Sequence, residues 1–411
     1  MKITISKKYL LFLGFLYFFI FKDFLEGHIA ILGYMDELVS IMAIPIILIS
    51  KGNILKKRCF RYRYFIYGFT LVGILSSLYY QYQPLLTCAM PDLFLNIKFW
   101  LSIIVGYFIF GGLSLKKYAK NIYFHIRLII WLYVCLIALD YLTGCFNSSI
   151  RYGLRSTQLF YTHPTVFSAC CVLLLGILFS VRDYVQRSDK YFIILLILMC
   201  TTLRSKAFGA VLMFSVFYYI VYLRKRKIRI RTLLFFAPAI IAVAWDQIYY
   251  YFFSSVQNDS ARYQLLVKSV QIANDHFPLG AGFGTYGSYF STVSYSPLYN
   301  IYNLSGVHGL SYGSSNFASD NFWPMILGET GWIGLVLTVS AMGILFVTIQ
   351  KIRKINVSYN FAAVCMFVYL LIASTAEAAF VNSIAVPIAI WLGCLFAQKN
   401  FVEEVDRNVS G

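Results

Sequence analysis

Charged side chains are scarce in this chain. Only 13% of its 411 residues are Asp, Glu, Lys or Arg, whereas a soluble globular domain carries about a quarter. Hydrophobic residues make up 60% instead, and apolar runs long enough to cross a bilayer recur along the whole length. The scarcity of charge therefore excludes an ordinary soluble domain. It predicts an all-α polytopic membrane protein.

Patterns that ligate metals are also missing. The sequence has no Cys-x-x-Cys pair and no Cys/His spacing typical of a metal site, so we expect no bound metal. The nine cysteines are interpreted as small apolar residues. A disulfide between Cys88 and Cys145, which both fall on the predicted outer side, is left open as an alternative.

The positive charge is distributed as a topology signal. The net charge is +18, but Lys and Arg lie in short clusters between apolar runs, above all in "RKRKIRIR" (Arg224–Arg231). These clusters fall in every second connecting segment, as the positive-inside rule requires. We therefore expect both termini in the cytoplasm, the lipid bilayer as the surroundings and no nucleic-acid partner.

We predict about twelve spans in a single transmembrane domain over residues 1–411. They lie at about residues 9–25, 29–49, 64–82, 93–111, 121–141, 163–181, 190–203, 207–223, 232–252, 322–349, 359–376 and 381–397. One connecting segment, residues 253–321 between spans nine and ten, is a large extracytoplasmic loop. Loops of this length are usually functional or disordered, and its many tyrosines and glycines argue against disorder.

Two cations occupy an unexpected place in "CTTLRSKAFGAV". Arg204 and Lys206 lie where the chain turns on the outside. The apolar run before Arg204 has about thirteen residues and rises about 20 Å, less than the bilayer core of about 30 Å. Arg204 should therefore lie inside the bundle, where a charge requires a wet cavity or a counter-charge. The alternative is that the pair extends to the outer headgroups.

Further external cations point the same way. "SARYQLLVKSVQIAND" (Ser260–Asp275) is typical of an amphipathic helix, and Arg262 falls in the middle of its apolar face. Alternatively the helix starts later and Arg262 is a loop residue. Arg151 and Arg155 precede the sixth span, which begins at His163 followed by a proline. A lone histidine there is more often structural. Several arginines facing one cavity suit a lipid phosphate or diphosphate.

A glycine-rich stretch, "HFPLGAGFGTYGSYFS", follows the amphipathic helix. Because it follows a helix and lies outside, its glycines do not form a dinucleotide-binding fingerprint. We expect them to form tight turns close to the bundle or to a ligand.

Two acids follow the long loop. Asp320 is a candidate helix cap, as is Ser319, and otherwise a general base or a group that orients a substrate hydroxyl. Glu329 lies deeper in the tenth span, where an acid is a functional candidate by default. Its structural alternative is an ion pair with Lys98 or Arg127.

Four stretches together resemble one family. They are "RSTQLFYTHPTVFSA", "RSKAFGAV", "ARYQLLVKSVQIANDHFPLGAGFGTYG" and "SDNFWPMILGETGWIGL". In this order, outside the membrane, they resemble the O-antigen and capsule polymerases (Wzy-like), which are related to the O-antigen ligases (WaaL-like). The resemblance implies a GT-C-like architecture in the bacterial cytoplasmic (inner) membrane, with the site facing outwards. It implies a glycosyltransferase without metal or cofactor that uses undecaprenyl-diphosphate-linked oligosaccharide, together with a chain-length regulator and a flippase.

The resemblance also implies roles for single residues. Arg204 and Arg262 would hold the diphosphate, and Asp320 stands near the place where ligases carry a histidine, which favours a polymerase over a ligase. The expected substrate-binding residues are Lys206, Arg151, Arg155, His163, His276, His308, Tyr263 and Glu329. A ligase of the same family and a flippase or other transporter remain as alternatives. The enzyme readings require Arg204, Arg262 and Asp320 to converge on one outward site.

Overall fold

A computed structural model describes residues 6–146, 149–229 and 260–398, with isolated positions between 231 and 253. Most of the predicted ninth span, 232–252, therefore lies outside the described residues. The described chain is mostly helical, and six of its helical segments are long and apolar enough to cross a membrane. The prediction of a helical membrane protein is thus supported, and the count of twelve spans stays a prediction.

The helices begin and end within a few residues of the predicted spans. The first half of the chain contains α1 (Lys7–Glu26), η1 (Ala30–Tyr34), α2 (Met35–Ile41), α3 (Ala43–Ile49), η2 (Arg58–Phe60), α4 (Arg63–Tyr80), η3 (Leu85–Ala89), α5 (Met90–Ile109) and α6 (Leu115–Thr143). A short antiparallel hairpin follows, made of β1 (Ile150–Arg151) and β2 (Leu154–Arg155).

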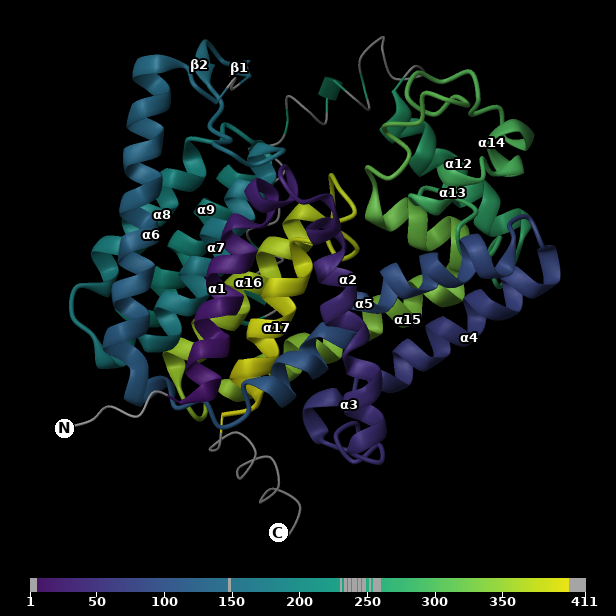
Figure 1. Ribbon diagram of the computed structural model, residues 1–411. Coiled ribbons are helices and arrows are strands. Elements are labelled where there is room, and N and C mark those ends of the chain that lie inside the picture. Colours follow the sequence, from purple (N-terminus) through teal and green to yellow (C-terminus); the bar gives the residue numbers. More distant parts are fainter. Residues whose placement is uncertain are drawn as a thin grey trace.

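The second half continues the same pattern. It contains α7 (Pro164–Val181), η4 (Arg182–Tyr184), α8 (Ser188–Cys200), α9 (Ser205–Tyr218), η5 (Tyr219–Leu223), α12 (Ala261–Asp275), α13 (Phe290–Val293), α14 (Pro297–Ile301), α15 (Phe322–Ile352), α16 (Val357–Ala373) and α17 (Ala385–Phe396). The hairpin and α12 to α14 lie at one end of the bundle, and the start of α1 and the end of α17 lie at the opposite end (Figure 1).

The core of the bundle is built on α7, α16 and α17, which are apolar on all faces and buried along almost their whole length. Such all-round apolar helices are expected in the centre of a membrane bundle. Glycines bring α17 and α5 together, because a Cβ on Gly106 would overlap the carbonyl of Ile390, and one on Gly393 that of Ile103. This close approach through small residues is typical of helix contacts in membranes.

Residues 260–321 have a small hydrophobic core of their own, to which Leu265, Tyr286 and Tyr299 contribute. The predicted amphipathic helix is present as α12, which packs against α15. Its buried face is narrower than predicted, because Leu266 and Val270 are exposed. The segment is therefore a folded cap over one part of the bundle.

The glycine-rich stretch forms turns against the bundle, as predicted. Gly280, Gly282, Gly284 and Gly287 all have positive φ angles, which only glycine adopts without strain. At Gly282 an added Cβ would lie 2.8 Å from Ser77 of α4. This segment therefore joins the cap closely to the membrane helices.

A buried ion network connects α1, α2 and α5. Asp36 accepts from Lys22 at 2.5 Å and from Lys98 at 2.9 Å, and Lys98 also reaches Glu37 at 3.0 Å. The expected partner of Lys98, Glu329, is therefore wrong. Arg127 is not the partner of Glu329 either, since its guanidinium lies over the rings of two tyrosines.

Candidate functional site

Four of the predicted cations converge on His163 at the end of the bundle that carries the hairpin. Partial burial, together with the positive charges of Arg204, Lys206, Arg151 and Arg262, lowers the pKa of His163 to about 4. These residues come from three separate stretches of the sequence: β1, the start of α9 with its N-cap, and α12. The fold thus brings together the cations that the sequence placed singly outside the membrane.

The hairpin is joined to the turn between α8 and α9, which positions two of the arginines. Thr157 N donates to Thr201 O at 3.0 Å, and Ser156 Oγ donates to Thr202 O at 2.7 Å. Arg151 Nη1 donates to Leu203 O at 3.2 Å. The next residue is Arg204, which directly precedes α9.

The helix before that turn, α8, has only 13 residues, so it rises about 20 Å. Arg204 is the N-cap of α9 and Lys206 lies in its first turn. Their depth in the bilayer stays a prediction. The first N–H groups of a helix have no partner within it and favour anions, so α9 adds to the positive potential of the arginines.

Two carboxylates enter the cluster from distant parts of the chain. Lys206 Nζ lies 2.7 Å from Glu377 Oε2, and both side chains are 15% exposed. Arg262 Nη2 lies 3.2 Å from Asp320 Oδ2. Glu377 follows α16 and Asp320 directly precedes the start of α15, whose Trp323 donates to Ser374 Oγ at 3.1 Å. This bond connects the two segments that carry the acids.

A short hydrogen-bonded chain links His163 to Glu377. His163 Nδ1 lies 2.8 Å from Thr165 Oγ1, and Thr165 Oγ1 lies 3.4 Å from Glu377 Oε2. The histidine also caps α7, since its Nδ1 accepts from Thr165 N at 3.3 Å. Asp23 Oδ2 holds the preceding residue by accepting from Thr162 N and Oγ1. His163 is therefore a structural cap as well as a member of the cluster.

Asp320 forms an ion pair with Arg262 and does not cap α15. The N-cap of α15 is Asn321, so the predicted capping roles of Ser319 and Asp320 are wrong. Burial raises the pKa of Asp320, although Arg262 and Lys206 act to lower it. A carboxyl with a raised pKa is suited to accept a proton near neutral pH.

Three other predicted residues lie outside the cluster. Arg155 donates to Asp140 O at 2.5 Å, at the end of α6. His276 terminates α12, where its Nδ1 bonds to the helix backbone and its Nε2 lies 3.0 Å from the hydroxyl of Tyr82. His308 is exposed in the cap. The sequence alone did not distinguish these three residues from the cations around His163, because all of them were predicted to lie outside the membrane.

Tyr263 and Glu329 have different surroundings. Tyr263 is half-buried on α12, next to Arg262. Glu329 is fully buried within α15, where it accepts from Tyr286 N at 3.4 Å and its carboxyl contacts that of Asp92. It therefore joins the cap to α5 through a second carboxyl, and it is separate from the ion pairs around Arg262.

Glu377 and Thr165 were not found from the sequence. The sequence did contain a signal for Glu377, because it lies in "STAEAAF" between two strongly apolar segments. An acid in such surroundings is a functional candidate. Glu377 Oε1 is buried without a hydrogen-bond partner among the described residues. A buried acceptor of this kind calls for an explanation, such as a bound ligand or water.

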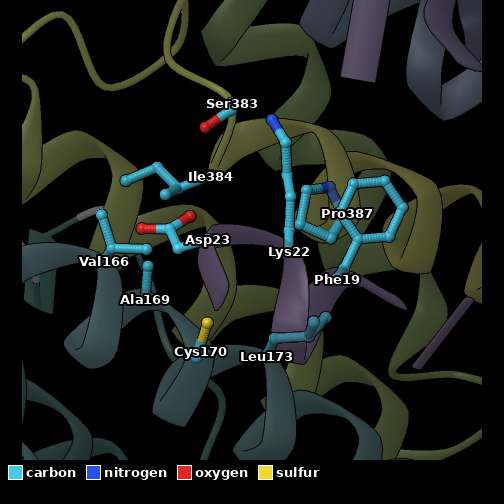
Figure 2. A pocket seen from close by; sticks show the side chains of 10 residues that line it. All are labelled: Phe19, Lys22, Asp23, Val166, Ala169, Cys170, Leu173, Ser383, Ile384 and Pro387. Carbon is cyan, nitrogen blue, oxygen red and sulfur yellow. The ribbon is translucent and has the colours of Figure 1, made fainter. Parts of the chain in front are cut away.

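A small cavity lies next to the cluster, between α1, α7 and the residues that lead into α17. Figure 2 shows its lining, in which Lys22, Asp23 and Ser383 are the polar side chains. Val166 lines it and directly follows Thr165.

The chemistry of the cluster favours an anion. Four cations, Arg151, Arg204, Lys206 and Arg262, lie around His163, and two carboxylates, Glu377 and Asp320, pair with Lys206 and Arg262. Guanidinium groups match phosphate oxygens in a bidentate geometry. The sequence matches no protein-family model and no curated protein, so function is inferred from this geometry.

The structure also tests two further predictions, one about a disulfide and one about Pro164. All nine cysteines are free, so the bridge between Cys88 and Cys145 is wrong; Cys88 is buried and Cys145 is exposed. Pro164 occupies the first turn of α7, as predicted.

Proposed function

We propose that the cluster binds the diphosphate of a lipid-linked oligosaccharide and that the protein is a polysaccharide polymerase. It would transfer the growing glycan from undecaprenyl diphosphate to a sugar hydroxyl of an incoming lipid-linked repeat unit. The observation that carries this proposal is the convergence of four cations around His163 at the heads of membrane helices. There a lipid tail can remain in the bilayer while its headgroup reaches the arginines.

In this proposal the arginines act on the leaving group. Arg204 and Arg262 hold the diphosphate, with Arg151 and Lys206 adding positive potential. The bond between the anomeric carbon and the phosphate oxygen breaks, and its electron pair stays on the diphosphate. Fixed positive charges aimed at this developing charge lower the barrier. No metal or cofactor is required for this step.

Asp320 is the proposed general base. The acceptor hydroxyl attacks the anomeric carbon, a new carbon–oxygen bond forms, and the hydroxyl proton passes to the Asp320 carboxylate. The 3.2 Å pair with Arg262 supports a coupling between the two steps. When Arg262 turns to the diphosphate, Asp320 loses its cation and becomes more basic. The base is thus activated only when the donor is bound.

Glu377 is proposed as a positioning residue. It holds Lys206 at 2.7 Å and contacts Thr165, which in turn bonds to His163. The Glu377 carboxylate thereby orients two side chains, Lys206 of α9 and His163, which caps α7. Tyr263, next to Arg262, is placed to contact the first sugar.

The related alternatives share the donor site. An O-antigen ligase would use the same diphosphate site with a different acceptor, and a flippase would need a site that opens to both sides of the membrane. The pairing of Asp320 with Arg262 favours the enzyme, because a transporter needs no base beside its anion site. A chain-length regulator and a flippase would be the partners, in a bacterial cytoplasmic membrane with both termini inside and the site outside.

The test uses purified protein in nanodiscs, undecaprenyl-diphosphate-linked repeat units, a chelator and no nucleotide. A ladder of products spaced by one repeat unit supports the polymerase, and Arg204→Ala should abolish it. Arg155→Ala, which removes an external arginine outside the cluster, serves as the matched control. Transfer only onto a supplied lipid A core would indicate the ligase. Absence of any transfer by folded wild-type protein would reject both enzymes.

A further inference from the structure

A second site of distinctive chemistry lies at the other end of α15. A cavity of about 930 Å³ occurs where the last turns of α15 meet the start of α4 and the residues that follow η5. Because α15 begins beside Asp320, this cavity is separated from the outer cluster by the length of the helix. It belongs to the end of the bundle at which α1 begins and α17 ends (Figure 1).

The polar part of this cavity is positively charged. Among the described residues that line it none is acidic, and five are basic: Lys227, Arg229, Lys351, Arg353 and Lys354. Lys351 also lies in the repulsive field of Arg58 and Arg61. Like charges held close together repel one another, and a bound anion would relieve that repulsion.

Two buried donors in the same place have no acceptor among the described residues. They are Gln350 Nε2 and Arg353 Nη1, and both residues line the cavity. A buried donor without an acceptor is destabilising, and a ligand that supplies oxygen atoms removes the penalty.

A stripe of apolar residues on α15 begins in the cavity lining, with Gly343 and Val347, and continues along the helix beyond it. Val336, Val339, Gly343 and Val347 recur at helical spacing, and the three valines are exposed. A Cβ added at Gly343 would meet no atom within 4 Å, so the helix surface is open there. The stripe ends one turn before Lys351. Its length and direction suit an acyl chain lying along a membrane helix.

We propose that this site binds one anionic phospholipid, with its phosphate near Gln350, Lys351 and Arg353 and an acyl chain along the valine stripe. Charge complementarity favours an anionic over a zwitterionic headgroup. Basic pockets between membrane helices on the cytoplasmic side bind such headgroups. The proposal is independent of the proposed function, since it rests on other residues at the opposite end of the molecule.

Lipid retention measured by native mass spectrometry tests the charge part of this proposal. Wild-type protein is taken from nanodiscs of phosphatidylcholine with phosphatidylglycerol and is compared with the triple variant Lys351→Gln, Arg353→Gln and Lys354→Gln. The wild type should retain phosphatidylglycerol preferentially. Each lost cation should weaken retention about fivefold.

The matched control is the triple variant Lys116→Gln, Lys117→Gln and Lys120→Gln, which removes the same charge from the exposed start of α6. It should retain phosphatidylglycerol like the wild type. Equal losses in both triple variants, or no loss in the first, would overturn the proposal.

A photo-crosslinking residue at position 343 identifies the occupant directly. After irradiation, mass spectrometry should find an adduct with phosphatidylglycerol in excess of its share of the lipid. The same residue at position 14, which is also open, should show no such preference. An adduct with a peptide of this chain or of a second copy would overturn the proposal, because the protein itself would then cover the stripe.

Discussion

Binding of a diphosphate to the outer cluster should raise the pKa of His163. The pKa is lowered from 6.5 to about 4 in the free protein by burial and by four cations. A bound anion compensates those cations, and the pKa then moves back towards its ordinary value. At about pH 5.5 the free protein holds this ring neutral, whereas an unperturbed histidine is mostly protonated. Binding should therefore take up a proton.

The sign of the pH dependence follows from this linkage. Because the bound state holds the proton more tightly, affinity for the anion should rise as the pH falls from about 6.5 towards 4. Full relief of the depression would change the affinity a few hundredfold. The ring is exposed to solvent, where screening weakens such effects, so we expect about tenfold.

Calorimetry with methylenediphosphonate measures this proton uptake, since titrations in buffers of different ionisation enthalpy report protons exchanged on binding. His163→Asn should lose the uptake at pH values between about 4 and 6.5. His308→Asn, which alters an exposed histidine outside the cluster, is the matched control. The probe's own titration is common to all variants. Equal proton uptake by wild type and His163→Asn would refute the electrostatic reasoning.

Three further predictions concern the proposed enzyme and the bundle. Arg204→Ala and Arg262→Ala should each abolish long-chain polymer at near-normal protein levels, and replacement of either arginine by lysine should fail as well, because an ammonium lacks the bidentate fork. Gel ladders from these variants are compared with that of the control Arg155→Ala. Long chains in the alanine variants would contradict the diphosphate site. Asp320→Asn should retain diphosphate binding but slow transfer about a hundredfold or more; unchanged rates would remove Asp320 as the base. Gly106→Val should force α5 and α17 apart and lower the melting temperature measured in detergent, with a loss of about 1–3 kcal/mol; an unchanged melting temperature would show that the two helices separate easily.

Local patterns in the sequence predicted the helices well. Apolar runs gave the helix limits, and the placement of Arg262 on the apolar face of an amphipathic helix predicted that it points towards the bundle. The number of spans was harder to test, because α8 and α17 have only 13 and 12 residues. Helices of this length fall short of the bilayer core, so length and composition alone do not identify them as spans.

Pairings between distant segments could not be predicted. Nothing in the local sequence around Lys206 indicates that Glu377 is its partner, because the contact arises only when α9 packs directly against α16 in the bundle. The same holds for Lys98, whose expected partner Glu329 was replaced by Asp36 and Glu37. Ion pairs in a bundle are decided by packing, and packing depends on the whole chain.

The ion pairs Lys206–Glu377 and Arg262–Asp320 help a membrane bundle to hold four cations close together. Isolated charges at this depth are costly, and two carboxylates, Asp320 and Glu377, reduce that cost while no ligand is bound. In our proposal the cluster also binds an anionic ligand. A diphosphate would compete with Asp320 for Arg262, and the displaced carboxylate would be left beside the acceptor. The ion pair that stabilises the resting site would thus become the source of the base, which makes donor binding and base activation one event.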